Sequence, residues 1–73
     1  MSHVNRDARK KFSPHQSAAG IVTTYLRGDA TLAIARIRQV PEADREHVIA
    51  LVTSALSKPD VENLRRYGQD LFA

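Results

Sequence analysis

The side chains of this sequence that are able to perform chemistry are few and lie far apart along the chain. Its three histidines are His3, His15 and His47, and its 73 residues include no cysteine. A metal site needs several such ligands that converge, for example two histidines four residues apart on one helix. Asp44 and His47 come nearest to that pattern, and an ordinary polar pair on a helix face explains them better. We therefore predict no metal ion and no cofactor.

The nucleophiles and phosphate-binding loops of common enzymes are also missing. Without cysteine there is no thiol nucleophile, and no Gly-x-Ser-x-Gly sequence holds a serine on a sharp turn. The three glycines are too widely spaced to form a phosphate-binding loop. A chain of this length also has little room for the concave pocket of an enzyme. We predict that the protein has no catalytic residues and is not an enzyme.

Formal charge is distributed unevenly along the chain, whose net charge is +3. The basic side chains before residue 13 are Arg6, Arg9, Lys10 and Lys11. Only Asp7 opposes them, whereas the rest of the chain carries seven basic and seven acidic residues. The N-terminal segment has few large apolar residues and buries too little surface to offset the entropy of ordering it. We expect residues 1–12 to form a flexible, disordered basic arm.

Start and stop signals divide residues 13–73 into about four short helices. The start signals are Ser13 with Pro14, Asp29 after Gly28, Pro41, and Ser57 with Pro59. The first two helices are expected over about residues 14–27 and 30–40, the third from Pro41 to about Leu56, and the fourth from about Pro59 to Leu71. Phe12, just before the first cap, is expected to pack back on the first turn.

Apolar residues recur at helical spacing and predict which faces are buried. The predicted faces are Ala18, Ile21, Val22, Tyr25 and Leu26; Ala30, Ile34, Ile37, and Val40 or Pro41; Val48, Leu51, Val52, Ala55 and Leu56; and Val61, Leu64, Tyr67 or Gly68, and Leu71. Both tyrosines are expected in the core, with hydroxyls that reach water. The fold class that follows is all-α, a compact bundle of about four helices behind the arm, with a single helical domain over residues 13–73.

Two glycines fall inside predicted helices, where glycine costs about 1 kcal/mol relative to alanine. These are Gly20 and Gly68. Close approach of two helices is the favoured explanation, and a groove that exposes backbone to a partner is the alternative. Leu71 and Phe72 are adjacent and cannot both point inward, so one of them either closes the core or contacts a partner.

No stretch reaches the roughly 20 apolar residues of a membrane span, and the polar N-terminus lacks the apolar run of a signal peptide. We expect a cytoplasmic protein that does not bind membranes. Its basic arm has three candidate roles, which are solubility, contact with nucleic-acid phosphates, and docking on an acidic protein surface. The third predicted helix carries three acidic residues, which disfavours it as a DNA-reading helix.

The basic sequence NRDARKK ahead of an all-helical body, in a cysteine-free chain of 73 residues, resembles the small phage-encoded proteins that bind host bacterial RNA polymerase. The resemblance covers the whole chain. It implies a transcription regulator that acts without a cofactor, inhibits initiation and promotes read-through of terminators. It also implies a partner in the large polymerase subunits, where the protein would displace contacts of the sigma factor or of promoter DNA.

Charge and expected exposure, and not the resemblance, indicate the partner-binding residues. These are Val4, Asn5, Arg6, Arg9, Lys10 and Lys11. We expect them to order along an acidic or strand-edge surface of the polymerase, while the helical body docks through an apolar or mixed face. The alternative is a small helical DNA-binding protein that uses the arm for phosphate contacts, and a toxin–antitoxin or chaperone-like adaptor is a third hypothesis.

Overall fold

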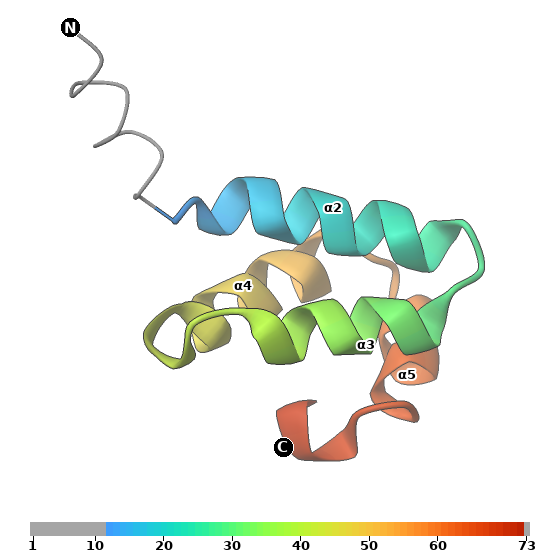
Figure 1. The fold of residues 1–73 in the computed structure, drawn as a ribbon. Helices are drawn as coiled ribbons and strands as arrows, with labels where there is room; N and C mark the ends of the chain where they lie inside the picture. The colour runs from blue at the N-terminus through green and yellow to red at the C-terminus, as the bar shows by residue number, and fades with distance from the viewer. Residues whose placement is uncertain (1–11, 73) are drawn as a thin grey trace, which may run out of the picture.

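Four α-helices and a terminal 3-10 helix make up residues 12–72, the part of the chain that our computed structural model describes (Figure 1). The elements are α2 (Pro14–Leu26), α3 (Ala30–Gln39), α4 (Glu42–Ala55), α5 (Lys58–Arg65) and the 3-10 helix η1 (Gln69–Phe72). No strand occurs within these residues, so the predicted all-α class is confirmed. The predicted arm lies outside the described residues except for its last member, Phe12.

The first helices begin and end where local hydrogen bonds satisfy their free backbone groups. Ser13 Oγ accepts a hydrogen bond from the Gln16 amide at 3.3 Å, which caps α2 as predicted. Asp29 Oδ1 accepts one from the Leu32 amide at 3.0 Å and caps α3. Gly28 between them has a φ of +97°, a left-handed conformation that glycine adopts without a steric cost. The turn that joins α2 to α3 is therefore dictated by local sequence.

Helix α2 packs against both α3 and α4. It runs antiparallel to α3, and α4 packs against both from behind (Figure 1). Helix α5 lies near the C-terminal end of α2, and η1 returns beneath α3. Because α2 packs on two neighbours, its apolar face takes part in both helix–helix contacts.

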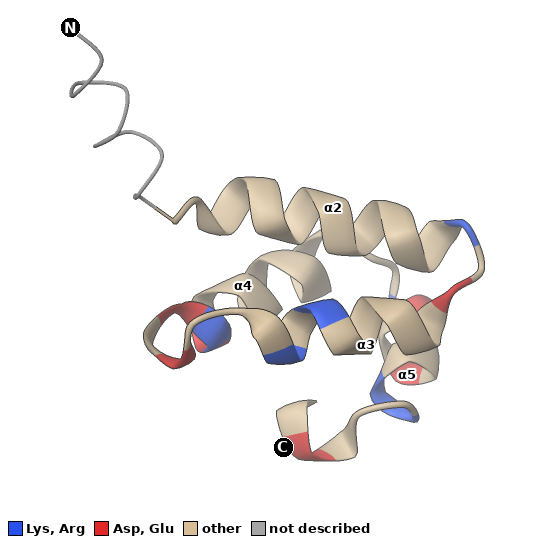
Figure 2. Ribbon diagram, in the orientation of Figure 1, with Lys and Arg blue, Asp and Glu red and all other residues tan. Residues whose placement is uncertain are grey.

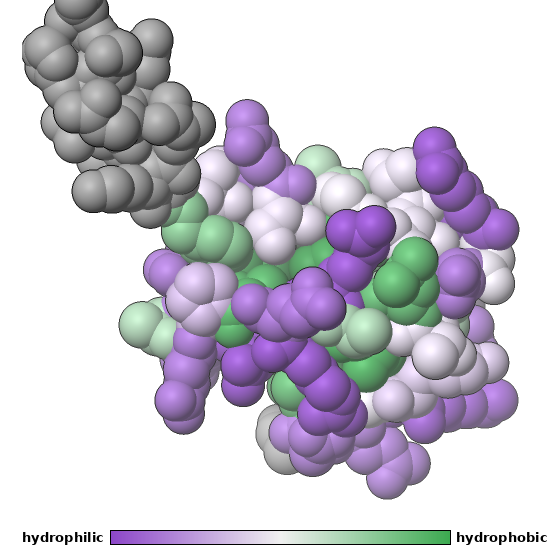
Figure 3. All heavy atoms as spheres, viewed as in Figure 1, coloured by the Kyte–Doolittle hydropathy of each residue, from purple (hydrophilic) through white to green (hydrophobic). Residues whose placement is uncertain are grey.

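The core takes at least one fully buried apolar side chain from each α-helix. Ile21 comes from α2, Ile37 from α3, Val48 and Val52 from α4, and Leu64 from α5. On the face seen in Figure 3, apolar side chains lie in a band framed by hydrophilic ones. Each such side chain stabilises the fold by about 1.5–3 kcal/mol relative to remaining exposed, which makes every core position significant in so small a domain.

One position of the apolar face predicted for α2 and one of that predicted for α4 are exposed. Leu26, expected on the inner face of α2, is 63% exposed, and Ala55 of α4 is also exposed. The buried face of α2 is centred on Ala18, Ile21 and Tyr25, and successive residues of a helix point about 100° apart. Leu26 is the last residue of α2 and lies off this buried face, so the helical period alone overstated the width of the buried stripe.

The fourth predicted helix was too long, because α5 ends at Arg65 and the chain resumes as η1. This break reverses the expectation for Tyr67, whose ring is 51% exposed instead of lying in the core. Gly68 takes the inward position, where a Cβ atom would lie 2.9 Å from Ile34 Cδ1. Gly68 therefore does lie close to α3, but between α5 and η1 and not inside a helix as predicted, and the helix break leaves Tyr67 outside. Leu71 and Phe72 of η1 are both half-buried and pack against the core, so the expectation that only one of them could point inward is wrong.

The explanation proposed for Gly20 is wrong. A Cβ atom built at this position of α2 meets nothing within 4 Å, so no neighbouring helix requires a glycine there. Gly20 instead lines an open hollow of the surface. This leaves the alternative explanation, in which a partner approaches bare backbone.

Polar contacts between distant residues attach the C-terminal segment to α3. Arg38 Nη1 and Nη2 donate hydrogen bonds of 2.9 and 3.0 Å to the two carboxylate oxygens of Asp70 on η1. Arg45 of α4 donates to the backbone oxygens of Arg38 and Val40 at 3.1 and 3.0 Å, and so caps the end of α3. These contacts connect α3, α4 and η1 at one end of the bundle.

None of the helices in the described part of the chain combines the length and the apolar character needed to cross a membrane.

Candidate partner-binding surface

The six residues predicted to bind a partner, Val4, Asn5, Arg6, Arg9, Lys10 and Lys11, all lie outside the described residues. Their contacts therefore remain a prediction. The structure does describe the surface where the arm joins the body, which begins at Phe12. That surface indicates what a partner bound to the arm meets next.

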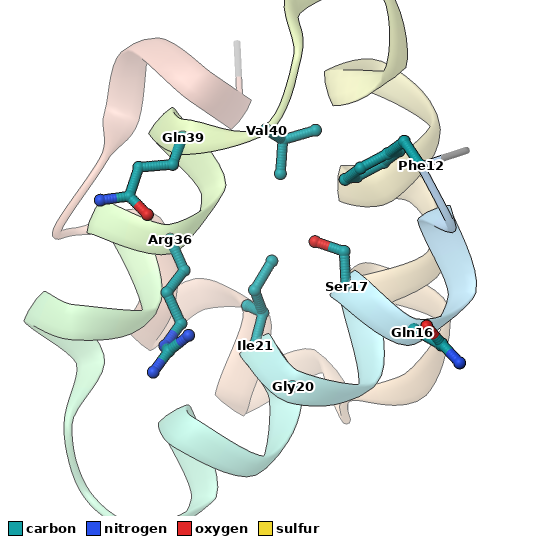
Figure 4. A pocket seen from close by; sticks show the side chains of 8 residues that line it. All are labelled: Phe12, Gln16, Ser17, Gly20, Ile21, Arg36, Gln39 and Val40. Carbon is teal, nitrogen blue, oxygen red and sulfur yellow. The ribbon is translucent and has the colours of Figure 1, made fainter. Parts of the chain in front are cut away.

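A hollow of about 280 Å³ lies between α2 and α3 directly beside Phe12 (Figure 4). We call it the Phe12 hollow, and its lining residues are Phe12, Gln16, Ser17, Gly20, Ile21, Arg36, Gln39 and Val40. Ile21 and Val40 are buried and form an apolar floor, whereas Phe12 is 36% exposed at the rim. The hollow therefore combines an apolar floor with a polar and aromatic edge.

Local sequence explains how these side chains reach the hollow. The cap at Ser13 fixes the path by which the chain enters α2, and this directs Phe12 toward α3. An apolar residue just before a helix cap usually packs against the fourth residue of the helix. In α2 that residue is the polar Ser17, so Phe12 has no apolar partner there. Phe12 shares the hollow with Ile21 and Val40 instead. The ring thus remains partly available to a partner.

The Phe12 hollow carries positive charge and hydrogen-bonding groups without an acidic residue in its lining. Arg36 extends from α3 into this region, and the side-chain amides of Gln16 and Gln39 lie at its edges (Figure 4). The one ion pair within residues 12–72 joins Arg38 to Asp70, so Arg36 has no carboxylate partner there. An exposed guanidinium beside amides favours carboxylate or phosphate groups.

The Arg38–Asp70 pair is a structural contact. The hydrogen bonds from Arg38, with burial opposing them, hold the pKa of the Asp70 carboxyl below its ordinary value of 3.8. The same bonds raise the pKa of the Arg38 guanidinium. Arg38 is already paired with Asp70, so it does not add a free cation to the Phe12 hollow.

The structure brings together two histidines that the sequence analysis treated separately. His15 on α2 and His47 on α4 lie edge to face, with ring centroids 5.9 Å apart. Within residues 12–72, no three histidine, aspartate or glutamate side chains lie close enough to hold a metal ion. Helix α2, which carries His15, has no Lys, Arg, Asp or Glu residue (Figure 2).

Comparison of the chain with protein-family models, curated proteins and solved structures finds no match in any of the three. The argument for function therefore depends on the sequence and the structure of this chain. Sequence reasoning gave a groove over bare backbone as the alternative for Gly20, but it did not place Arg36 beside Phe12. Arg36 lies off the apolar stripe of α3, and its proximity to Phe12 depends on how α2 and α3 pack.

Proposed function

We propose that this protein is a non-enzymatic transcription regulator that binds bacterial RNA polymerase in the host cytoplasm and inhibits initiation. It acts by occupying a surface of the large subunits, so that a competing contact such as that of the sigma factor is displaced. Read-through of terminators follows if the same surface serves elongation. The proposal develops the resemblance in overall layout and requires neither a cofactor nor a bond-breaking step.

The observation that carries the proposal is the distribution of charge around the junction of arm and body. The arm holds the entire net charge of +3, and the Phe12 hollow continues it with Arg36 and no acidic lining residue. An acidic protein surface fits this arrangement, because it meets the arm and then the hollow without like charges opposed. The exposed ring of Phe12 adds an aromatic contact, a residue type that is enriched in protein interfaces.

DNA binding is the second candidate, because phosphates are attracted by the same cations. Two features weigh against it as the main function. Helices α2 and α3 lie antiparallel along their lengths, unlike the steeply crossed pair of a helix-turn-helix (Figure 1). The first turn of α4 carries Glu42 and Asp44, which repel phosphate.

A tagged pull-down from bacterial lysate at about 0.15 M salt tests the proposal, since this salt screens exposed charges beyond about 8 Å. We expect the full chain to retain the large polymerase subunits, and a chain that begins at Ser13 to lose them. Arg36→Glu should weaken retention, whereas the control Arg65→Glu on α5 should not. Recovery of nucleic acid alone, or of a different single protein, would contradict the proposal.

Binding to duplex DNA separates the two candidates directly. We expect little affinity for duplex DNA at low salt compared with affinity for purified polymerase. Strong duplex binding that falls steeply as salt increases, with no binding to polymerase, would instead establish the DNA-binding alternative.

A further inference from the structure

A second hollow of the surface, with a volume of about 370 Å³, lies between α4 and η1. We call it the Glu46 hollow, and its lining residues are Glu42, Arg45, Glu46, Ile49, Asp70 and Leu71. Ile49 and Leu71 are half-buried and pack against the core, whereas Glu42 and Glu46 are exposed. The hollow therefore joins an apolar floor to an acidic rim.

The charges that line the Glu46 hollow favour a basic occupant. The lining holds three carboxylates and one guanidinium. Glu42 and Glu46 have no cation partner within residues 12–72, where the one ion pair joins Arg38 to Asp70. The guanidinium belongs to Arg45, whose Nη2 atom already donates to two backbone oxygens at the end of α3, at 3.1 and 3.0 Å. Two exposed glutamates thus remain available to an occupant that carries cations.

The basic arm joins the body at the same end of the bundle as this hollow. Phe12, the last residue of the arm, lines the Phe12 hollow together with Val40, and Glu42 follows Val40 by two residues. His15 in the first turn of α2 and His47 of α4 have ring centroids only 5.9 Å apart. Figure 2 shows the acidic start of α4, drawn red, at the end of the bundle where the chain enters α2. The arm therefore begins beside an acidic surface of its own chain.

The arm is also long enough to reach the Glu46 hollow. Consecutive Cα atoms are about 3.8 Å apart, so those of Val40 and Glu42 are separated by at most about 8 Å. Lys10 and Lys11 directly precede Phe12, and an extended chain advances roughly 3.3–3.6 Å per residue. A tethered segment has an effective concentration on the order of millimolar at a site within its reach. The arm should therefore occupy the hollow in preference to a free segment of another molecule.

We propose that the Glu46 hollow binds the basic arm of the same chain when no partner is present. Basic side chains of the arm pair with Glu42 and Glu46, and their aliphatic stems cover the apolar floor. Each exposed ion pair stabilises the contact only slightly, so a more acidic partner surface displaces the arm. The contact is therefore autoinhibitory, because affinity for a partner falls with the fraction of arm that is docked. It concerns the free protein, and so it stands whether or not the partner is polymerase.

A nitroxide label on the arm of the full chain tests this contact. The sequence contains no cysteine, so Ala8→Cys provides a single attachment site among the basic residues. We expect the label to broaden the amide NMR signals of Ile49 and Leu71 more than that of Ser17, which lies nearer the start of α2. The broadening of Ile49 and Leu71 should fall at least about twofold in 1 M salt, where the Debye length is about 3 Å.

Matched variants assign the contact to the carboxylates of the hollow. Glu46→Gln should reduce the broadening of Ile49 and Leu71, and Glu42→Gln with Glu46→Gln should remove it. Glu62→Gln on α5 makes the same change of charge and should leave the broadening unaltered. Glu62 is a suitable control because it is exposed and does not line the Glu46 hollow. Glu46→Gln should also raise affinity for a hexaglutamate peptide about twofold more than Glu62→Gln does, since it releases the arm.

Three results would overturn the inference. The first is broadening that is no greater at Leu71 than at Ser17, and the second is broadening that Glu46→Gln and Glu62→Gln change equally. The third comes from mixing the labelled chain with an isotope-enriched chain that carries no nitroxide. Broadening of Leu71 in the enriched chain would show that the occupant is the arm of a second copy. A failed polymerase pull-down, in contrast, would refute only the proposed function.

Discussion

At the scale of single residues, two glycines show how packing decides the effect of one methyl group. Gly20 lies exposed in the middle of α2 with nothing near its Cβ position. Gly68 is buried, and a Cβ atom there would lie 2.9 and 3.2 Å from two carbons of Ile34 and 3.2 Å from Leu71 Cδ1. The same substitution should therefore have opposite effects on stability at the two sites.

We expect Gly20→Ala to raise the free energy of unfolding by about 0.5–1 kcal/mol, because alanine favours the helix and restricts the unfolded chain. Gly68→Ala should lower it by about 1 kcal/mol, because Ile34 is in the core and cannot shift without disturbing its neighbours. Urea denaturation of the two variants measures both changes. A stabilised Gly68→Ala variant would show that Ile34 has room to move.

The Arg38–Asp70 pair leads to a prediction about pH. The folded state lowers the pKa of Asp70 below its ordinary value of 3.8, so the unfolded chain takes up the proton first as the pH falls. The stabilisation from this pair is present above pH 3.8 and is lost as the pH falls through the lowered folded value. Because both groups are exposed, the effect should be small.

Asp70→Asn removes that titration. We expect the variant to be slightly less stable than the natural sequence at neutral pH and equally stable in strong acid. Thermal unfolding at several pH values compares the two chains. A difference between them that persists below the folded pKa of Asp70 would mean that the carboxylate charge is not the cause.

At the scale of elements, the attachment of α5 depends on contacts with helices that are distant in sequence. Leu64 is its fully buried residue, and Asp60 and Asn63 both bond to the Tyr25 hydroxyl of α2. A helix of eight residues is too short to be stable by itself in water. The phenol of Tyr25 should therefore matter more for α5 than for the rest of the bundle.

Tyr25→Phe keeps the ring and removes both hydrogen bonds. We expect the free energy of unfolding to fall by about 1–2 kcal/mol, because Asp60 and Asn63 lose their common partner. Hydrogen exchange should accelerate most in α5, and less in α2 and α3. Equal acceleration in every helix would show that α5 does not open separately.

At the scale of the whole molecule, the described body has a core of its own. The buried apolar residues within residues 12–72 all lie between Ala18 and Leu64. A chain that begins at Ser13 keeps that core and the cap of α2. We expect its thermal midpoint to lie within about 4 °C of that of the full chain, a difference that corresponds to less than 1 kcal/mol in a domain of this size. Circular dichroism during heating checks this, and loss of helix on truncation would assign the arm a structural role.

The sequence by itself determined the class of the fold and most helix ends. Caps, prolines and the left-handed Gly28 act through bonds to residues three or four positions away, so local sequence suffices to predict them. The early end of α5 is the exception. Gly68 replaces Tyr67 at the inward position there, because Ile34 of α3 leaves no space for a side chain.

Only the tertiary structure decided which surfaces remain available to a partner. A helical period shows which residues share an apolar face, but it does not show how much of that face the neighbouring helices cover. It therefore predicted that Leu26 and Tyr67 are buried. The partners of Tyr25 are 35 and 38 residues away, a separation at which sequence spacing carries no information about contact. The Phe12 hollow likewise exists only because α2 and α3 pack side by side. Local hydrogen bonding thus specifies the helices, and the packing angles between them specify the sites.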